Sequence, residues 1–346
     1  MAGYYFNLPA ITQLTIPQQA ALNETRPIAL SGGPGTGKSV VSLWRHINNY
    51  NREHPKNSYL ITFTSTLEHF LIGCCKTQNQ IASQNINRSL KSQYKLRSHH
   101  FDEVIIDEAQ DLQINYYQGI ISPVSYGADE SQIVYFPGSK KIELRKLFPN
   151  NVEYVLDKNF RNTKRILEFA RQAFPNAVIS QRTIDTTKAE GELPVLLISN
   201  GNKYDKTNNK QDYAICQIIK QFHNTPNQYN NIAILLPWKS DIPIFESVLN
   251  NNGIDYSVYY EDANRFPNRF EGNLKDVHLT TFKSAKGLEF DTVIIPNFHK
   301  YNEIHGQFNT DWEDFYVACT RTRSNLYLIS NYDLPNLNSV TDKQVL

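Results

Sequence analysis

Apolar residues in this chain gather in short continuous runs, and these runs alternate with stretches that have a helical pattern. Short apolar runs predict strands that are covered on both faces, as in a parallel sheet. The candidate strands are residues 59–64, 103–107, 152–156, 193–199, 231–236, 277–282, 292–296 and 325–330. In residues 162–174 the apolar side chains recur on one face of a helix, which Asn162 or Thr163 can cap. The alternation predicts an α/β fold.

The length of the chain bears on the number of domains. Its 346 residues are enough for two domains that each bury a core. The clearest division in the pattern falls near residue 150, so we expect one domain over 1–150 and a second over 151–346.

The composition narrows the class of protein. Apolar residues make up 40% of the chain, but they form no continuous run of eighteen residues, the length that a membrane span requires. Residues 1–13 lack the basic segment and apolar stretch of a secretory signal. The four cysteines lack zinc-ligand spacing and suit a reducing cytosol, so we expect a cytoplasmic protein with no membrane partner. The 35 basic and 34 acidic residues nearly cancel, so a nucleic-acid site would be a local groove.

A glycine-rich stretch before an apolar helix carries the first chemical signal, because residues 32–39 read G-x-x-x-x-G-K-S. Glycines let the backbone turn its N–H groups inward, where they hold phosphate oxygens together with the helix N-terminus. Lys38 is expected to reach the β- and γ-phosphates of ATP, and Ser39 to ligate Mg²⁺. The plainer alternative is a glycine turn before a helix. The predicted nucleotide-binding residues here are Gly32, Gly33, Pro34, Gly35, Thr36, Gly37, Lys38 and Ser39.

The stretch "EVIIDEAQD" (103–111) is an apolar strand that ends in acidic residues. Asp107, at the end of the strand, is placed to hold the Mg²⁺, and Glu108 can orient and deprotonate the attacking water. Alone, the segment could be a strand followed by a solvated acidic turn. Together with the phosphate-binding loop, it predicts ATP hydrolysis.

With these two motifs, the chain resembles the UvrD-like superfamily 1 helicases and translocases over most of its length. The stretches that match the family's motifs, in the family's order, are "LTIPQQAAL" (14–22), "LITFTS" (60–65), "DEAQ" (107–110), "ADESQIVYF" (128–136), "NFRN" (159–162), "TTFKSAKGLEFD" (280–291) and "YVACTRTR" (316–323). The resemblance implies two RecA-like P-loop NTPase domains with parallel sheets.

The resemblance also implies roles around the nucleotide. Gln18 falls in the adenine-reading position, and Phe160 matches an aromatic residue that stacks on adenine. Arg161 and Arg321 match arginines that face the γ-phosphate, where two guanidinium groups would stabilise developing charge. Either arginine could instead be a surface helix residue.

Two further pairs of residues are implied by the same motifs. Gln110 and Gln132 match residues that sense the γ-phosphate and link it to the nucleic-acid groove. Gly287 and Glu289 would bring the 280–291 stretch near the nucleotide, with Glu289 on the ribose.

The expected nucleic-acid track is built from aromatic and polar residues. Phe63 and Thr64 lie where the family touches single-stranded DNA, although Phe63 could instead be core, since it sits in an apolar strand. Tyr135 and Phe136 match stacking aromatics, which bind bases regardless of sequence. The remaining candidates are Trp238 with Lys239, beyond a strand end, and Lys283, which stands where the family commonly has His.

The chain departs from the larger family members where they carry inserted accessory domains. Before "DEAQ" it has only the segment 68–102, which carries the basic residues Arg88, Lys91, Lys95 and Arg97. This segment could be a small basic flap over DNA or a solvated helical hairpin. The second accessory domain is expected to be absent.

The leading interpretation is an ATP- and Mg²⁺-dependent helicase or translocase on single-stranded DNA, moving 3′ to 5′ if the resemblance holds. RNA is left open as the substrate. An alternative is an ATP-switched clamp on nucleic acid that licenses a partner, such as a nuclease in repair or anti-phage defence. A third class, a P-loop enzyme for a small molecule, is disfavoured by the two arginine motifs.

Overall fold

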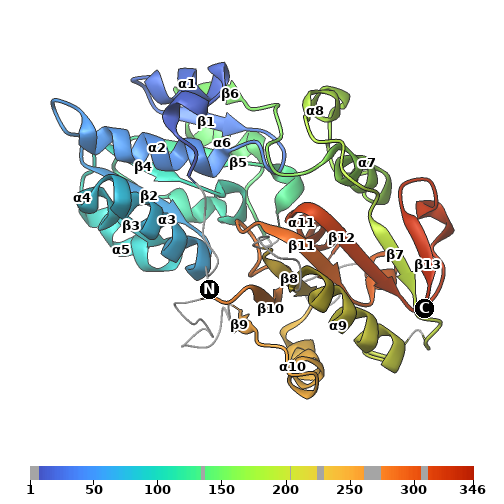
Figure 1. Ribbon diagram of the computed structural model, residues 1–346. Coiled ribbons are helices and arrows are strands. Elements are labelled where there is room, and N and C mark those ends of the chain that lie inside the picture. The colour runs from blue at the N-terminus through green and yellow to red at the C-terminus, as the bar shows by residue number, and fades with distance from the viewer. Residues whose placement is uncertain (1–7, 134–136, 203, 224–229, 261–273, 305–310) are drawn as a thin grey trace. The chain divides into compact units, whose positions relative to one another are not determined.

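The computed structural model describes residues 8–133, 137–202, 204–223, 230–260, 274–304 and 311–346 (Figure 1). The chain divides into two compact units. The first unit ends at Phe160 and the second unit begins at Arg161. Each unit is an α/β layer structure around one parallel sheet, which confirms the predicted fold class.

The first unit contains a six-stranded sheet in the order β3-β2-β4-β5-β1-β6, and every neighbouring pair is parallel. Its strands are β1 (Ile28–Ser31), β2 (Ser58–Thr62), β3 (Ile86–Arg88), β4 (Glu103–Ile106), β5 (Val124–Ala128) and β6 (Val152–Val155). Residues 152–155 pair with β1, so this strand belongs to the first unit. The division therefore falls after Phe160 rather than near residue 150, where the sequence pattern placed it.

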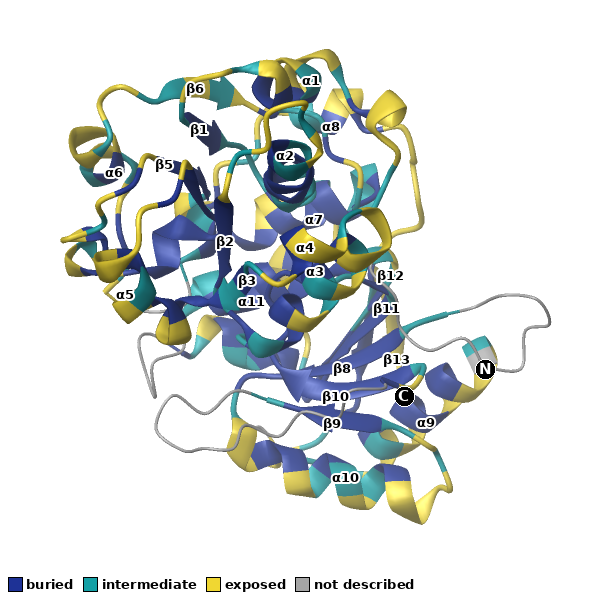
Figure 2. Ribbon diagram, turned by 90° about the vertical axis from the view of Figure 1, so that its left-hand side faces the viewer, coloured by how far each residue is buried: buried dark blue, intermediate teal, exposed yellow. Residues whose placement is uncertain are grey.

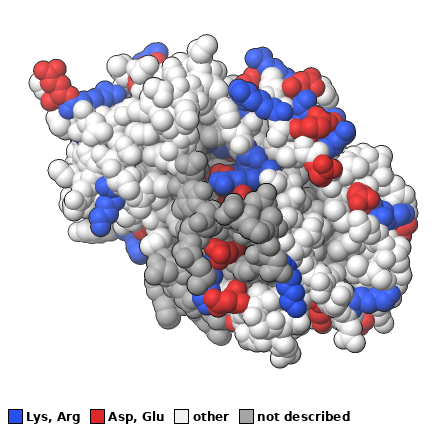
Figure 3. Space-filling model, viewed as in Figure 1, with Lys and Arg blue, Asp and Glu red and all other residues white. Residues whose placement is uncertain are grey.

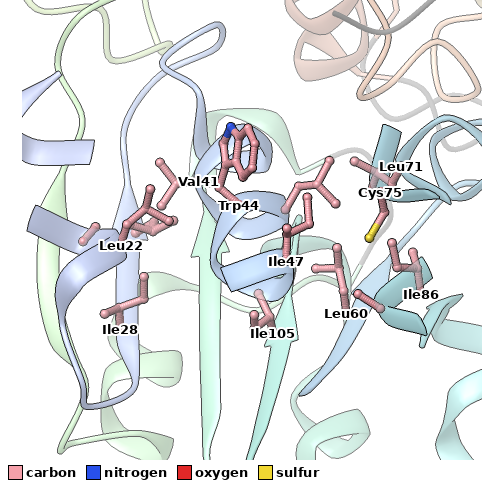
Figure 4. Close-up of a cluster of buried hydrophobic side chains, with 14 of the residues drawn as sticks. Leu22, Ile28, Val41, Trp44, Ile47, Leu60, Leu71, Cys75, Ile86 and Ile105 are labelled. Carbon is pink, nitrogen blue, oxygen red and sulfur yellow. The ribbon is translucent and has the colours of Figure 1, made fainter. Parts of the chain in front are cut away.

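The helices of the first unit cover both faces of its sheet. They are α1 (Ile16–Asn23), α2 (Lys38–Asn51), α3 (Ser65–Gln78), α4 (Gln80–Ser83), α5 (Ser89–Ser98) and α6 (Lys141–Leu147). Successive strand residues point to opposite faces. Leu60 of β2 accordingly joins a cluster with α2 and α3 (Figure 4), whereas its neighbours Tyr59 and Ile61 join a second cluster with α5 and α6.

The segment 68–102 is part of this fold and is neither a flap nor a solvated hairpin. Its strand β3 pairs with β2 and extends the sheet. Leu71, Cys75 and Ile86 are buried in the same cluster as α2. Arg88 is also buried and forms an ion pair with Glu68, with Nε 3.4 Å from Oε2.

A buried ion pair ties α2 to the start of β4. The Nε of Arg45 lies 2.7 Å from Oε1 of Glu103, and both side chains are almost fully covered. Arg45 also donates hydrogen bonds to the carbonyl oxygens of Ala21, Glu24 and Arg26. This one guanidinium group therefore holds the end of α1 and the turn before β1 against the sheet.

The second unit contains a seven-stranded sheet in the order β13-β7-β12-β11-β8-β10-β9, also parallel throughout. Its strands are β7 (Val195–Ile198), β8 (Ile232–Leu236), β9 (Ser257–Tyr259), β10 (Val277–Thr281), β11 (Phe290–Ile295), β12 (Thr322–Ser330) and β13 (Asp342–Val345). The helices are α7 (Lys164–Ala173), α8 (Gln181–Thr186), α9 (Asn209–His223), α10 (Ile242–Asn251) and α11 (Trp312–Cys319).

The central strands of the second unit are buried, whereas α10 is exposed on one side and buried on the other (Figure 2). One apolar cluster joins α9 and α10 to the sheet. The ring centroid of Phe298 lies 6.1 Å from that of Phe169 on α7 and 6.1 Å from that of Phe315 on α11. Thr163 caps α7, and its Oγ1 accepts a hydrogen bond from the N–H of Ile166.

Removing one member of the Arg45–Glu103 pair should destabilise the first unit strongly. In Glu103→Gln the buried guanidinium group loses its counter-charge, and breaking such a pair costs about 3–5 kcal/mol. Denaturant unfolding measures the loss. The exposed pair Arg145–Glu153 provides the matched control, because Glu153→Gln should change stability little. Equal, small effects of the two substitutions would contradict this account.

Candidate nucleotide site

The carboxyl ends of parallel strands meet at one edge of a sheet, which is where α/β proteins bind ligands. In the first unit, residues 32–37 follow β1, Asp107 follows β4 and Asp129 follows β5. Because β5 lies between β1 and β4 in the sheet, these three connections are neighbours.

The loop after β1 has the backbone that its glycines were expected to provide. Gly32, Gly35 and Gly37 have φ values of 151°, 69° and 85°, and Gly37 is the N-cap of α2. A Cβ on Gly32 would lie 2.2 Å from the carbonyl oxygen of Leu156. Thr36 is buried, and its hydroxyl donates to the carbonyl oxygen of Gly33. The loop is therefore held by its own Thr36 hydroxyl and by the segment that follows β6, which contains Leu156.

The Lys38 side chain lies inside this loop. Its Nζ donates to the carbonyl oxygens of Gly32, at 2.7 Å, and Gly33, at 3.0 Å. It also lies 3.9 Å from Oδ2 of Asp129. Gly127 on β5 lies next to Lys38, because a Cβ there would be in ordinary van der Waals contact with the Lys38 Cβ, at 3.6 Å. The ammonium group is thus already directed at the position where the loop would hold a phosphate.

Asp107 and Ser39 form the candidate metal pair. Burial, together with the charge of Glu108, raises the pKa of Asp107 to about 7, and a hydrogen bond with the Ser39 side chain opposes the rise. The buried Oδ2 of Asp107 has no hydrogen-bond partner in the described structure. A hydroxyl and a carboxylate are the oxygen ligands that Mg²⁺ prefers, so the pair fits this ion. No group of three or more His, Cys, Asp or Glu residues that could hold a metal occurs among the described residues.

A chain of polar side chains runs from Glu108 to Gln132. Glu108 has a left-handed backbone, with φ 57°, and its Oε2 accepts a hydrogen bond from Nε2 of Gln110 at 2.5 Å. Oε1 of Gln110 accepts from the backbone N–H of Asp129 at 3.1 Å. Nε2 of Gln132 in turn donates to Oδ2 of Asp129. The structure therefore brings together Lys38, Gln110 and Gln132 around Asp129, and Glu108 joins them through Gln110.

Asp129 was not among the predicted site residues. The signal was available, because Asp129 matches the acidic position of the 128–136 motif. Its carboxylate lies beside Lys38 and binds Gln132, and it also caps the short helix that follows by accepting from the N–H of Ser131.

Gln18 contacts the phosphate-binding loop, and its predicted contact with adenine stays a prediction. Its Nε2 donates to the carbonyl oxygen of Thr36 at 3.0 Å, and its Oε1 accepts from the N–H of Thr15 at 2.8 Å. The side chain is buried. In this structure Gln18 therefore caps α1 and braces the phosphate-binding loop.

Phe160 lies against the same loop. Its backbone N–H donates to the carbonyl oxygen of Gly35 at 2.9 Å, and Nδ2 of Asn159 donates to that of Pro34 at 2.7 Å. The Phe160 side chain is 53% exposed, and Nζ of Lys158 lies 5.3 Å from the ring centroid. An exposed ring fixed to the loop by its own backbone is placed to stack on a base.

Arg161 and Glu289 meet in the second unit. Nη2 of Arg161 lies 3.5 Å from Oε1 of Glu289, and Nε of Arg323 donates to Oε2 at 2.8 Å. Burial alone would raise the pKa of Glu289, but Arg161 and Arg323 outweigh it and hold this pKa below its usual value. Glu289, the predicted ribose ligand, is therefore a carboxylate between two guanidinium groups. Arg323, which supplies one of them, was not among the predicted site residues.

Arg321 and Gly287 belong to the same region of the second unit. Arg321 is buried, and its Nε donates to the carbonyl oxygen of Val317 at 3.0 Å. Its own carbonyl oxygen accepts from the N–H of Phe290. Gly287 has φ 82°, a left-handed backbone that favours glycine. These contacts fix the 316–323 and 280–291 motifs to each other.

A buried carboxylate, Asp314 on α11, supports the 280–291 motif. Nζ of Lys283 lies 4.0 Å from Oδ1 of Asp314, and the charge of Lys286 also acts on it. Burial raises the pKa of Asp314 to about 7, with Lys283 opposing the rise. Neither Asp314 nor Lys286 was predicted from the sequence, because their role depends on burial in the folded chain.

The predicted nucleic-acid residues have mixed positions. Phe63 is half-buried against the core cluster under α5, and Thr64 is buried and caps α3. Nζ of Lys300 lies over the Trp238 ring, 5.1 Å from the ring centroid. Tyr135 and Phe136 lie outside the described residues. The side chain of Thr64 is covered in the described structure, and its predicted contact with DNA stays a prediction.

The Asp314→Asn variant should change stability in a pH-dependent way. Because the folded state raises the pKa of Asp314 from 3.8 to about 7, the parent binds a proton more tightly when folded. Its stability from this group is full at low pH and is lost as the pH rises toward 7. The variant should match the parent below about pH 4, exceed it increasingly as the pH rises, and melt at a clearly higher temperature near pH 8. The exposed Asp185→Asn is the control, and a Tm difference that does not vary with pH would contradict the assignment.

Comparison with proteins of known sequence gives named relatives. The chain is 24% identical over 307 residues to a putative ATP-dependent DNA helicase of Acanthamoeba polyphaga mimivirus, covering 81% of this chain and 40% of the relative. It is 22% identical over 250 residues to a probable DNA helicase of Mycoplasma pneumoniae, covering 66% and 43%. It is 28% identical over 183 residues to the ATP-dependent DNA helicase srs2 of Schizosaccharomyces pombe, covering 49% and 20%. The chain thus spans less than half the length of each relative.

Solved structures give two further likenesses. The C-terminal domain of a possible DNA helicase from a Lactobacillus is 20% identical, with a TM-score of 0.35, covering 54% of this chain and 98% of that one. The arterivirus nonstructural protein 10 helicase is 12% identical, with a TM-score of 0.45, covering 94% and 63%. Among the described residues, none of the helices combines the length and the apolar character that crossing a membrane requires.

The model of one protein family matches this chain directly. It is the family AAA_12, described as an AAA domain, and the match runs over residues 141–333. This match covers more than half of the chain. The chain therefore belongs to the AAA_12 family of AAA domains.

Proposed function

We propose that this chain is a UvrD-like superfamily 1 motor that hydrolyses ATP and moves 3′ to 5′ along single-stranded DNA. The observation that carries the proposal is the convergence of Lys38, Asp107, Glu108 and Asp129 at one edge of the first sheet. A cation, a buried carboxylate with an unused oxygen and a second acid are the groups that nucleotide hydrolysis requires.

Lys38 would change its partners when ATP binds. Its ammonium group now donates to two carbonyl oxygens of the loop. Phosphate oxygens carry charge and accept stronger hydrogen bonds than carbonyl oxygens do. We therefore expect Lys38 to turn to the β- and γ-phosphates while the loop N–H groups hold the rest of the phosphate chain.

Ser39 and Asp107 would hold the Mg²⁺ that accompanies ATP, which neutralises phosphate charge when bound. Glu108 would act as the base for the attacking water. Its Oε2 accepts from Gln110, which keeps the carboxylate oriented in its buried position. The left-handed backbone of Glu108 turns the chain sharply after Asp107, so two consecutive acids can serve different roles.

The polar chain from Glu108 to Gln132 supports a link between hydrolysis and the track. Asp129 lies next to Lys38 and also binds Gln132 and Gln110. A movement of Lys38 toward phosphate would therefore alter the contacts of both glutamines. Gln132 immediately precedes the stretch that holds the predicted stacking residues Tyr135 and Phe136.

DNA is the proposed track because the three relatives are named DNA helicases. The direction and the UvrD-like assignment are supported by the motifs 280–291 and 316–323. Phe160 at the loop and Arg161, which directly follows it in the chain, would contact the base and the γ-phosphate. In this proposal, ATP would draw Arg161 away from Glu289.

The catalytic proposal predicts distinct behaviour for two variants. Lys38→Ala should abolish ATP hydrolysis, because the phosphates lose their fixed cation. Glu108→Gln should still bind ATP and hydrolyse it very slowly, because it lacks the base. Steady-state ATPase assays with and without single-stranded DNA, together with nucleotide binding, test both. Normal turnover in either variant would refute its assigned role, and a parent ATPase indifferent to single strands would count against the DNA track.

Arg161→Ala should slow hydrolysis by roughly a hundredfold, because removing one preorganised charge from a transition state has effects of this size. The affinity for ATP should fall much less, since the contact strengthens as charge develops. Arg165→Ala is the matched control, because Arg165 lies on α7 in ion pairs with Glu168 and Glu190. If the two variants have the same rate, Arg161 is a structural residue only.

A further inference from the structure

The segment before β4 differs in charge from the rest of the chain. Residues 69–101 contain no Asp or Glu, but they contain five Lys and Arg residues, whereas the whole chain is nearly balanced. Two of these basic residues pack against other residues of the first unit. Arg88 is buried against Glu68, and Nζ of Lys95 lies 4.6 Å from the centroid of the Tyr59 ring. Lys91 and Arg97 are exposed on α5.

The inner face of α5 fixes the helix on the sheet. The hydroxyl of Tyr116 donates to the carbonyl oxygen of Ser89, and the Tyr59 hydroxyl lies 3.3 Å from Oγ of Ser92. Leu96 is buried in the cluster on this face of the sheet. These contacts fix which side of α5 faces the sheet, so the residues on the opposite side of the helix face solvent.

The outer face of α5 presents two large side chains to solvent. Tyr94 is 81% exposed and Leu90 is 70% exposed. They are four residues apart and so lie on the same side of the helix. Lys91 and Arg97 lie beside them, and this part of α5 is exposed in Figure 2. An aromatic ring among cations, with no acid on the helix, is the composition of a surface that binds nucleic acid.

The position of α5 in the first unit supports the same conclusion. The helix begins directly after β3, at the carboxyl edge of the sheet, where Phe63 also follows β2. Nη1 of Arg88 donates to Oγ of Ser65 at 2.5 Å. Glu68 accepts from the backbone N–H of Arg88 and lies 3.6 Å from Nζ of Lys91. The start of α5 is thus joined to the predicted track at the start of α3.

We propose that the outer face of α5, formed by Leu90, Lys91, Tyr94 and Arg97, is an accessory contact for single-stranded nucleic acid. In it, Tyr94 stacks on a base, Leu90 packs beside it, and the two cations hold phosphates. This rests on the proposed function. Figure 3 shows basic and acidic side chains intermixed on the face in view, so a local acid-free helix is a distinct feature.

The contact can be tested with a fluorescein-labelled oligothymidylate, by anisotropy over a series of salt concentrations. Tyr94→Ala should weaken binding about fivefold or more, because a lost base stack has at least this effect. The slope of log affinity against log salt should stay unchanged in this variant. Arg97→Gln should lower that slope by about 0.7, as expected for one lost phosphate contact on a single strand.

Two control variants make the test specific. Tyr94→Phe keeps the ring and should bind like the parent. Tyr213→Ala removes another exposed tyrosine, on α9, and should also bind like the parent. If Tyr94→Ala binds like the parent while the parent binds DNA, the α5 contact is overturned and the motor proposal stands. A parent that binds no single strand overturns both.

Discussion

The close contact between the phosphate-binding loop and the end of the first unit is the constraint on which the site depends. Gly32 passes so near the carbonyl oxygen of Leu156 that no side chain fits between them. Asn159 and Phe160 then bind the carbonyl oxygens of Pro34 and Gly35. The loop is therefore shaped by the segment that leads into the second unit, and Arg161 follows that segment directly in the chain.

A second feature of the site is that its polar groups share partners. Asp129 serves Lys38, Gln110 and Gln132 at once, and Glu289 serves Arg161 and Arg323. Shared partners make each group sensitive to the loss of its neighbours, since a buried polar group without a partner is costly. Such networks can therefore take only a few alternative arrangements, which suits the nucleotide-driven change that we propose for this site.

The sequence predicted the apolar runs that form β2, β4, β6, β7, β8, β10, β11 and β12. It missed the short strand β1 and the edge strands β3, β9 and β13. Edge positions tolerate polar residues, such as Asn87 in β3 and Lys343 in β13. It also missed β5, where Ser125 and Gly127 interrupt the apolar run. The Ser125 hydroxyl donates to the buried Glu103, so this polar residue inside the strand is explained only by a tertiary contact. The motif residues of the nucleotide site were predictable because their spacing along the chain is fixed, whereas Asp314 and Arg323 depend on non-local burial and pairing.

The brace that Gln18 provides has a consequence for how the chain can vary. A Cβ on Gly37 would lie 2.5 Å from Nε2 of Gln18, while that same amide group binds the carbonyl oxygen of Thr36. Gly37 also has a left-handed backbone, with φ 85°, which strains any residue that carries a side chain. Position 37 is therefore restricted to glycine by two independent constraints, its own backbone and the Gln18 amide. A shorter residue at position 18 would remove only the second constraint, so it would not by itself admit another residue at position 37.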